Sequence, residues 1–351
     1  MAGGAELQQT LIATTLAQRG YRVSMVSIDY GQEDGSVAKG VRIHNLHKPD
    51  EGVPVVRFFH PRMTSVFRAL KRANADVYFQ RTAAVHTGYL AAFSKLAGKP
   101  CIYSGASDVD FQPGRQDILY RRDRWLFEYG LRRVDRVVVQ NENQLRLLRE
   151  NYNREGILIP NCYEAPPGAR ADRQGYILWV AMMRHFKRPH LALEIARRLP
   201  QHKFVVIGGP DGSRKGEEIY REVSEGLRQL PNVEFKGMVP MDETERYFDG
   251  ARVFLNTSIY EGFPNTFLQA WARGLPCVGM CDVGSHGPSG PVYDLAPTVD
   301  EAVARVDRLM RDDLQWQQHS HRVLAHHRSV HSVEAVVDQY EREFVSLARK
   351  P

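Results

Sequence analysis

The sequence contains little cysteine and no long apolar run. Only four cysteines occur in 351 residues, and they are scattered along the chain. Cys277 and Cys281 lie close together, but no second pair completes a metal site, so we expect buried free thiols at all four positions, the others being Cys101 and Cys162. We find neither an apolar run that could span a bilayer nor a secretory signal. These absences predict a protein of the cytoplasmic side, peripheral to the membrane at most.

The charge balance is also only weakly biased. A formal net charge of +6 is modest for this length, and it favours anionic partners such as a nucleoside diphosphate or an acidic membrane face. The hydrophobic share of 43% and the charged share of 25% are those of an ordinary folded protein. The length exceeds that of one ordinary core and predicts two domains, with room for a cleft.

Apolar runs typical of buried strands alternate with helical patterns from end to end, which predicts parallel α/β architecture in two Rossmann-like halves. Runs such as 204–207 lack the polar alternation of half-exposed strands. The strands predicted in this way are 21–28, 77–80, 100–104, 136–140, 176–180, 203–207, 232–235 and 253–256.

A domain boundary is indicated at 160–174, where prolines, glycine and charged residues interrupt the pattern. We therefore expect an N-terminal domain of residues 1–165 and a C-terminal domain of residues 166–330. The last segment, 330–350, has apolar residues close to helical spacing, which predicts a terminal helix.

The most informative segment is 255–272. A strand there ends in small polar residues, a glycine-containing turn follows, and a helix is predicted to begin around Pro264 to Thr266. Free backbone N–H groups at such a helix start can bind a phosphate or a sugar hydroxyl. An ordinary strand-to-helix turn, which recurs in every α/β fold, explains the same pattern.

Residues 261–270, Glu-Gly-Phe through Gln-Ala, resemble the retaining GT-B glycosyltransferases of family 4 (glycosyl transferases group 1), whose motif is Glu-x7-Glu. Three other segments resemble that family. They are Gly3 to Glu6, like its glycine-rich acceptor-side loop; Ile159 to Asn161, like the end of its first lobe; and Met183 to Pro189, like its basic diphosphate loop. The resemblance implies two Rossmann-like domains facing a cleft, with the terminal helix 331–351 joining the N-terminal domain.

The resemblance also implies residue roles. Glu261 would contact the hydroxyls of the transferred sugar, and Arg184 and Lys187 would hold the diphosphate. Positioned cations can stabilise a departing nucleoside diphosphate without a metal, so we expect neither metal nor cofactor. A solvated helix face explains an Arg-x-x-Lys pair equally well, but the preceding strand favours a ligand crevice. The full set expected to bind the donor is Gly4, Arg184, Lys187, Gly237, Val239, Glu261, Gly262, Phe263, Pro264, Asn265, Thr266 and Gln269.

In the N-terminal half, the polar cluster from Ser107 to Asp110 follows the strand that begins at Pro100. Asp108 is our preferred cleft residue, with a polar or electrostatic role in catalysis beside Glu261, Arg184 and Lys187. Front-face departure and attack, as the family's retaining members are thought to use, requires no protein nucleophile. The alternative is that Asp108 caps the next helix.

The sequence departs from the family in two places. Position 269 is Gln rather than Glu, which predicts weaker ribose binding, because an amide offers one acceptor and a donor. We expect Gln269→Glu to retain or tighten nucleotide binding. In addition, no complete strand precedes Gly3-Gly4. The first strand of the N-terminal domain is thus expected to be missing, as from a late start.

Two basic stretches, 62–72 and 121–124, suit an anionic lipid surface, although solvated helices explain them as well. The late histidines, 319 to 331, lack the further ligands of a metal site.

We expect retaining transfer of a hexose-type unit from a nucleoside diphosphate sugar to a glycan or lipid-linked acceptor, in cell-surface polysaccharide or glycoconjugate synthesis. Nucleic acid is not an expected partner. The alternatives are a nucleotide-sugar epimerase and a non-catalytic sugar-nucleotide-binding protein. A dehydrogenase is disfavoured because no strand-linked Gly-x-Gly-x-x-Gly occurs.

Overall fold

The computed structural model describes residues 4–53, 56–172, 174–287 and 290–349. The chain divides into two compact units. One is Cys162–Ser332, and the other joins the chain up to Asn161 with the chain from Val333 on. The breaks expected from sequence were at 165/166 and after 330. Each unit is described by itself.

The unit Cys162–Ser332 is built on one six-stranded sheet in which every pairing is parallel. Its order is β10-β9-β8-β11-β12-β15, so the chain runs outward from β8 in one direction and then returns to start again at β11. In such sheets, ligands bind beyond the carboxyl ends of the strands where this order reverses. The strands are β8 (Tyr176–Val180), β9 (Phe204–Ile207), β10 (Val233–Gly237), β11 (Ala251–Asn256), β12 (Cys277–Gly279) and β15 (Asp294–Leu295).

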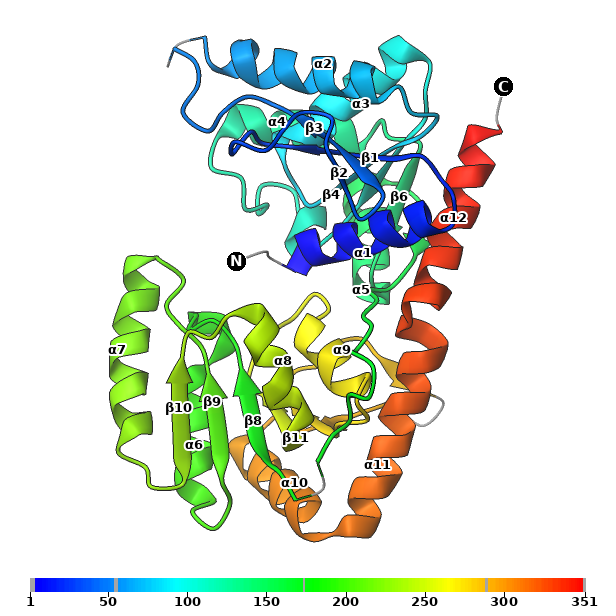
Figure 1. Ribbon diagram of the computed structural model, residues 1–351. Helices are drawn as coiled ribbons and strands as arrows, with labels where there is room; N and C mark the ends of the chain where they lie inside the picture. The colour runs from blue at the N-terminus through cyan, green and yellow to red at the C-terminus, as the bar shows by residue number, and fades with distance from the viewer. Residues whose placement is uncertain (1–3, 54–55, 173, 288–289, 350–351) are drawn as a thin grey trace. The chain divides into compact units, whose positions relative to one another are not determined.

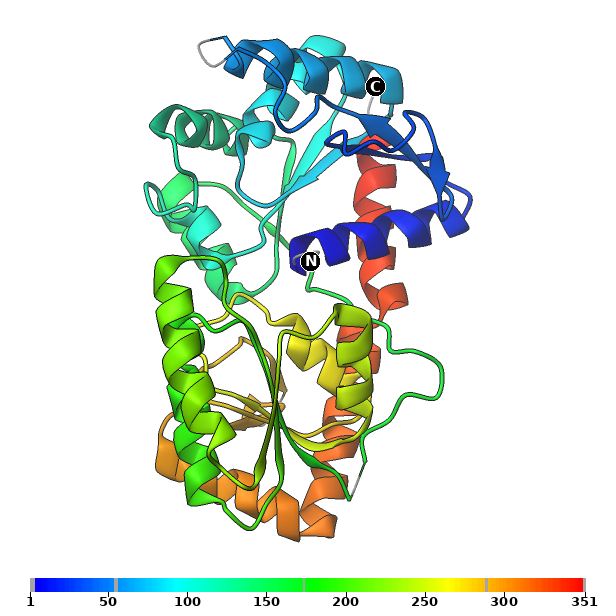
Figure 2. The ribbon, with the colours of Figure 1, turned by 60° about the vertical axis from the view of Figure 1, so that its left-hand side comes forward.

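Helices cover both faces of this sheet. Apolar side chains of α6 (Pro189–Arg198), α7 (Arg214–Arg228) and α10 (Val299–Arg311) form one core with the strands. On the other face Phe254 contacts Phe248 of α8 (Met241–Asp249) and Phe267 of α9 (Asn265–Trp271). Figures 1 and 2 show α7 and α8 on opposite sides of the strands. This double covering explains why the strands are continuous apolar runs. The unit is completed by η3 (His185–Lys187), the short pair β13 (His286–Gly287) and β14 (Gly290–Pro291), α11 (Asp313–His326) and η4 (His327–His331).

The other unit contains two sheets, where the sequence had suggested one. A parallel sheet has the order β4-β5-β6-β7, and a second sheet has the order β1-β3-β2. Within the described residues, β1 and β4 are each the last strand of their own sheet. The strands are β1 (Val23–Ser27), β2 (Val37–Ala38), β3 (Val41–Asn45), β4 (Tyr78–Arg81), β5 (Cys101–Ser104), β6 (Arg136–Val139) and β7 (Ile157–Leu158).

The sequence predicted a glycine-rich loop at Gly3 to Glu6. This prediction is wrong for Gly4 to Glu6, which form the start of a helix, α1 (Gly4–Gln18). Gly3 lies outside the described residues. The expected terminal helix is confirmed as α12 (Val333–Ala348). It packs into the unit that contains the chain up to Asn161, where Tyr340 and Phe344 meet the ring of Phe79 edge-on. The remaining elements are η1 (Phe58–Met63), α2 (Thr64–Ala73), α3 (Val85–Ala97), η2 (Asp108–Phe111), α4 (Arg121–Leu131) and α5 (Glu142–Tyr152).

Candidate active site

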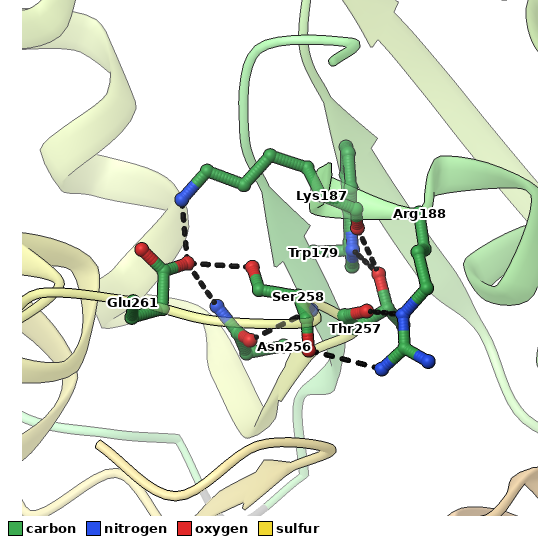
Figure 3. Close-up of polar contacts among 7 residues, drawn as sticks. All are labelled: Trp179, Lys187, Arg188, Asn256, Thr257, Ser258 and Glu261. Carbon is green, nitrogen blue, oxygen red and sulfur yellow. Dashed lines mark hydrogen bonds and ion pairs between the residues drawn. The ribbon is translucent and has the colours of Figure 1, made fainter. Parts of the chain in front are cut away.

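The loops that follow β8 and β11 meet at the point where the strand order of the six-stranded sheet reverses. The indole N–H of Trp179, in β8, donates to the hydroxyl of Thr257, just after β11, over 3.0 Å. That hydroxyl donates in turn to the backbone carbonyl of Lys187 over 2.6 Å. Arg188 joins the same two loops, because its guanidinium donates to the carbonyls of Thr257 and Ser258 at 2.6 and 2.9 Å. Figure 3 shows this set of contacts.

Within this frame Lys187 and Glu261 form an ion pair, with 2.5 Å between Nζ and Oε1. Their side chains are 19% and 8% exposed, so the pair is largely withdrawn from solvent. Oε1 also accepts from the hydroxyl of Ser258 at 2.5 Å and from the amide of Asn256 at 3.2 Å. Two residues that the sequence singled out separately are therefore brought together.

The second oxygen of Glu261 is held differently. Lys187, Asn256 and Ser258 all bind Oε1, and no described residue contributes a hydrogen bond to Oε2 (Figure 3). A carboxylate fixed through one oxygen keeps the lone pairs of the other for a hydroxyl donor. This geometry suits recognition of a polyol.

The other predicted cation, Arg184, lies nearer the surface. Its side chain is 47% exposed, and its Nε lies 3.1 Å from Oδ2 of Asp211, in the segment after β9. Hydrogen bonds from the hydroxyl and the backbone N–H of Ser213 lower the pKa of Asp211, and Arg184 adds to the effect. Burial lowers the pKa of Arg188, which clasps carbonyl groups instead of facing solvent. The sequence placed Arg188 in the basic loop but gave no sign of this role.

The segments after β9 and β10 lie at the same edge of the sheet. A Cβ on Gly208 would come within 2.1 Å of the carbonyl oxygen of Ala181, so only glycine fits where the chain leaves β9 beside the loop after β8. Gly237 ends β10 with a φ of 67°, and Val239, also predicted to contact the donor, follows two residues later.

The residues after Glu261 turn inward. The ring of Phe263 is buried, with 4.8 Å between its centroid and that of His331, and it also contacts Trp271 edge-on. Gly262 precedes it, Pro264 is the N-cap of α9, and Asn265 and Thr266 begin that helix. The predicted helix start is confirmed, and the side chain of Phe263 is committed to the core. The predicted donor contacts of this segment stay predictions.

Gln269 lies in a buried polar network that the sequence did not reveal. Its side-chain amide donates to Oε1 of Glu245, in α8, over 2.8 Å. Oε2 of Glu245 accepts from Arg273 at 2.7 Å and from the phenol of Tyr163 at 2.5 Å. Arg273, whose side chain is fully buried, also binds Asp249. Position 269 thus faces a carboxylate that no motif marked.

Asp108 belongs to the other unit and is not the helix cap. Ser107 and Asp110 form the capping box of η2, and burial raises the pKa of Asp110. Asp108 accepts a hydrogen bond from the amide of Asn143 at Oδ2, over 2.7 Å, whereas its buried Oδ1 has no partner in the part of the chain that the structure describes. Its proposed polar role remains a prediction.

The late histidines take structural positions. His327 has its Nε2 3.0 Å from the carbonyl oxygen of Tyr163, and the spacing from His327 to His331 falls in a π-helix. No cluster of three or more potential metal ligands was found among the residues described.

Two family models match the chain in succession. The model described as "Glycosyl transferase 4-like domain" matches residues 3–162, and the one described as "Glycosyl transferases group 1" matches residues 174–312. The chain belongs to the GT-B glycosyltransferases of family 4. Apart from its last residue, Cys162, the first match falls within the unit built on two sheets, and the second falls within the unit that carries the Lys187–Glu261 pair.

Individual relatives of this GT-B chain are distant. It is 28% identical over 223 residues to EpsF of Bacillus subtilis (strain 168), which is named as a glycosyltransferase. That match covers 55% of the chain and 54% of EpsF, so the chain spans about half the length of this relative.

Solved structures match over nearly the whole length. Sucrose-phosphate synthase of Thermosynechococcus elongatus has a TM-score of 0.75 at 17% identity, covering 99% of this chain and 94% of that one. HepE of Anabaena, in complex with UDP and glucose, has a TM-score of 0.71 at 14% identity, covering 98% and 96%. At such identities the likeness shows the fold alone.

Proposed function

We propose that this protein transfers a sugar from a nucleoside diphosphate sugar to a glycan or lipid-linked acceptor, with retention at the anomeric carbon and without a metal. The observation that carries the proposal is the Lys187–Glu261 pair at the reversal of the strand order, with Oε2 of Glu261 left to accept hydroxyls. Family membership supports it. The complex of HepE with UDP and glucose supports this class of donor.

In this proposal Glu261 accepts hydrogen bonds from the hydroxyls of the transferred sugar through Oε2. The ammonium group of Lys187 has three donors, one of which meets Glu261, so the others can meet the diphosphate. Arg184, on the exposed side, supplies a second cation as negative charge develops on the leaving group. The backbone at Gly237 and Val239 contacts the base, Gln269 contacts the ribose, and Asp108 keeps the polar role in catalysis proposed for it from the sequence.

Donor binding is tested first, by thermal unfolding against UDP, GDP, ADP, CMP and dTDP sugars, with NAD as a negative control. A ligand at a hundredfold excess over its dissociation constant stabilises the native state by about 2.7 kcal/mol. We expect the sugar nucleotides of one base to raise the unfolding temperature, and we expect Lys187→Ala and Glu261→Gln to remove this increase. The matched controls, Lys215→Ala and Glu217→Gln on the exposed side of α7, should keep it.

The reaction is then followed by proton NMR with the donor that binds. Transfer to water gives a free sugar whose first-formed anomer reports the stereochemistry, and added EDTA tests the independence from metal. Retention predicts the anomer of the donor. An epimerase would instead change the sugar while it stays on the nucleotide, and a non-catalytic binding protein would leave the donor intact.

A further inference from the structure

The outward face of α4 carries an aromatic stripe between arginines. Arg121, Trp125, Tyr129 and Arg133 follow one another at intervals of four residues, which places them on one side of the helix and of the turn that follows it. The rings of Trp125 and Tyr129 stack with 5.8 Å between centroids, and the guanidinium of Arg133 lies 4.0 Å from the centroid of Tyr129. The opposite side of α4 packs Phe127 and Leu131 into the core.

Other exposed apolar side chains adjoin this stripe. Leu119 and Tyr120, which lead into α4, are 85% and 55% exposed, and Trp125 is 64% exposed. The guanidinium of Arg122 lies 3.4 Å from the ring centroid of Phe58, which brings the start of η1 beside α4. Its neighbour Phe59 is 59% exposed. We call these residues, Phe59, Leu119, Tyr120, Trp125 and Tyr129, the α4 surface.

The α4 surface is set in positive charge. Segment 119–133 contains five arginines and two carboxylates. One of the carboxylates, Asp123, is paired with Arg122 and is 13% exposed, so it does little to offset the arginines outside. No carboxylate interrupts the stripe itself. Exposed aromatic and aliphatic side chains set among arginines match a surface that is apolar below and anionic above.

We propose that the α4 surface docks on a lipid bilayer that contains anionic lipid. Tryptophan and tyrosine settle at the headgroup level of a bilayer, and arginines bind lipid phosphates while their stems cover apolar surface. Basic side chains close to a membrane surface are attracted to leaflets that contain anionic lipids. A protein or glycan partner could also stack on Trp125, but the surplus of arginines around Leu119 favours the anionic surface of a bilayer.

The structure separates this surface from the other basic stretch. On α2 the apolar residues Val66 and Leu70 are buried in the core, and the exposed side presents Arg68 and Lys71. The apolar side of α2 is therefore used in packing against the core, and its exposed side carries charged side chains without the exposed apolar ones of the α4 surface.

Trp125 makes the proposal directly measurable. The other three tryptophans, Trp179, Trp271 and Trp316, are 1%, 0% and 5% exposed, so Trp125 is the tryptophan that acrylamide can reach. The full chain should co-sediment with vesicles of phosphatidylcholine and phosphatidylglycerol. These vesicles should also shift the tryptophan fluorescence to shorter wavelength and protect Trp125 from quenching by acrylamide. Vesicles of phosphatidylcholine alone should do none of these.

Four exposed variants test which face binds, by co-sedimentation after circular dichroism has shown that each is folded. Arg121→Glu should lower the partition coefficient about fivefold or more, since each basic residue contributes about that factor, and Leu119→Ser with Trp125→Ser should lower it further. Leu96→Ser, at a position 80% exposed on α3, and Arg68→Glu, on α2, should bind as the parent does.

Three outcomes would overturn the proposal: no binding to either vesicle, equal binding to both, or loss with Arg68→Glu but not with Arg121→Glu. Protection of Trp125 by soluble oligosaccharides and not by vesicles would assign the surface to a glycan. None of these measurements depends on sugar transfer, so failure here leaves the proposed glycosyltransferase activity untouched.

Discussion

The side-chain amide of Gln269 donates a 2.8 Å hydrogen bond to Glu245, whose other oxygen accepts from Arg273 and Tyr163. Position 269, where the family motif has its second carboxylate, therefore holds an amide. This amide contacts a carboxylate from α8, that of Glu245. Two adjoining carboxylates repel, whereas an amide donor and a carboxylate attract. Gln269 and Glu245 form a matched pair.

This pair predicts a stability cost for restoring the motif. Gln269→Glu should lower the free energy of unfolding at neutral pH by about 1–3 kcal/mol, because a hydrogen bond is lost and two carboxylates meet in a buried site. The repulsion raises the pKa of one carboxyl in the folded state, so the loss should shrink in acid, where that carboxyl is protonated. Urea unfolding at several pH values measures both effects.

The exchanged variant is the control for this prediction. Glu245→Gln combined with Gln269→Glu restores one amide and one carboxylate at this contact. Arg273 keeps its ion pair with Asp249 in this variant. It should recover most of the lost stability. A single Gln269→Glu variant as stable as the parent would show that the two side chains do not constrain each other.

The positions of the main strands were largely predictable from the sequence, because strands buried in a parallel sheet are continuous apolar runs. All eight predicted strands are present, and β8 and β11 fall on the expected segments. β3 was missed, because Val41–Asn45 mixes apolar and polar residues in only five positions. The division of the N-terminal strands, β1 to β7, into two sheets was missed too, because the pairing between strands leaves no local signal in the sequence.

Site residues were predictable as types but not as partners. The motif marked Glu261, and the basic loop marked Lys187, yet nothing in either segment says that they bind each other across 74 positions. Glu245 lies in an unremarkable helix, and His331 reaches Phe263 from η4. Only folding brings such residues together, so a sequence pattern can name one side of a contact and remain silent about the other.

The Lys187–Glu261 pair predicts strong coupling between two substitutions. Lys187→Met leaves the carboxylate of Glu261 largely buried without its cation, and it should cost about 3 kcal/mol of stability or more. Adding Glu261→Gln removes the orphaned charge and should recover part of that loss. Chemical denaturation of the two single variants and the double variant gives the coupling energy.

A matched cycle shows whether this coupling is specific. Lys203 and Glu234 pair at 2.9 Å with side chains 60% and 40% exposed, so substituting them should produce little coupling. Additive effects at Lys187 and Glu261, like those at the exposed pair, would mean that the buried pair is not held together in solution.

Gly208 predicts a steric limit at the edge of the site. Because its Cβ would lie 2.1 Å from a backbone oxygen of Ala181, Gly208→Ala must move the chain after β8 or β9. We expect a loss of roughly 2 kcal/mol or more and a weaker response to the donor in thermal unfolding. Gly287→Ala is the control, since its Cβ would meet Val292 at an ordinary 3.5 Å. Equal tolerance of both substitutions would contradict the close approach.

His327 predicts a loss of stability in mild acid. Burial lowers its pKa to about 4, well below the 6.5 of an ordinary histidine. As the pH falls from 6.5 towards 4, the unfolded chain takes up a proton that the folded chain refuses, so this one group removes stability on the order of 3 kcal/mol over that window. Other buried histidines with lowered pKa values, such as His326, steepen the slope.

Two glutamine variants isolate the contribution of His327. His327→Gln keeps an N–H that can donate to the carbonyl of Tyr163 but cannot titrate, so urea unfolding should show a shallower decline between pH 6.5 and 4. His321→Gln, on the exposed side of α11, should leave the decline as it is. An unchanged slope in His327→Gln would mean that the imidazole is protonated in the folded state within this range, and that the contact with Tyr163 is made by a charged ring.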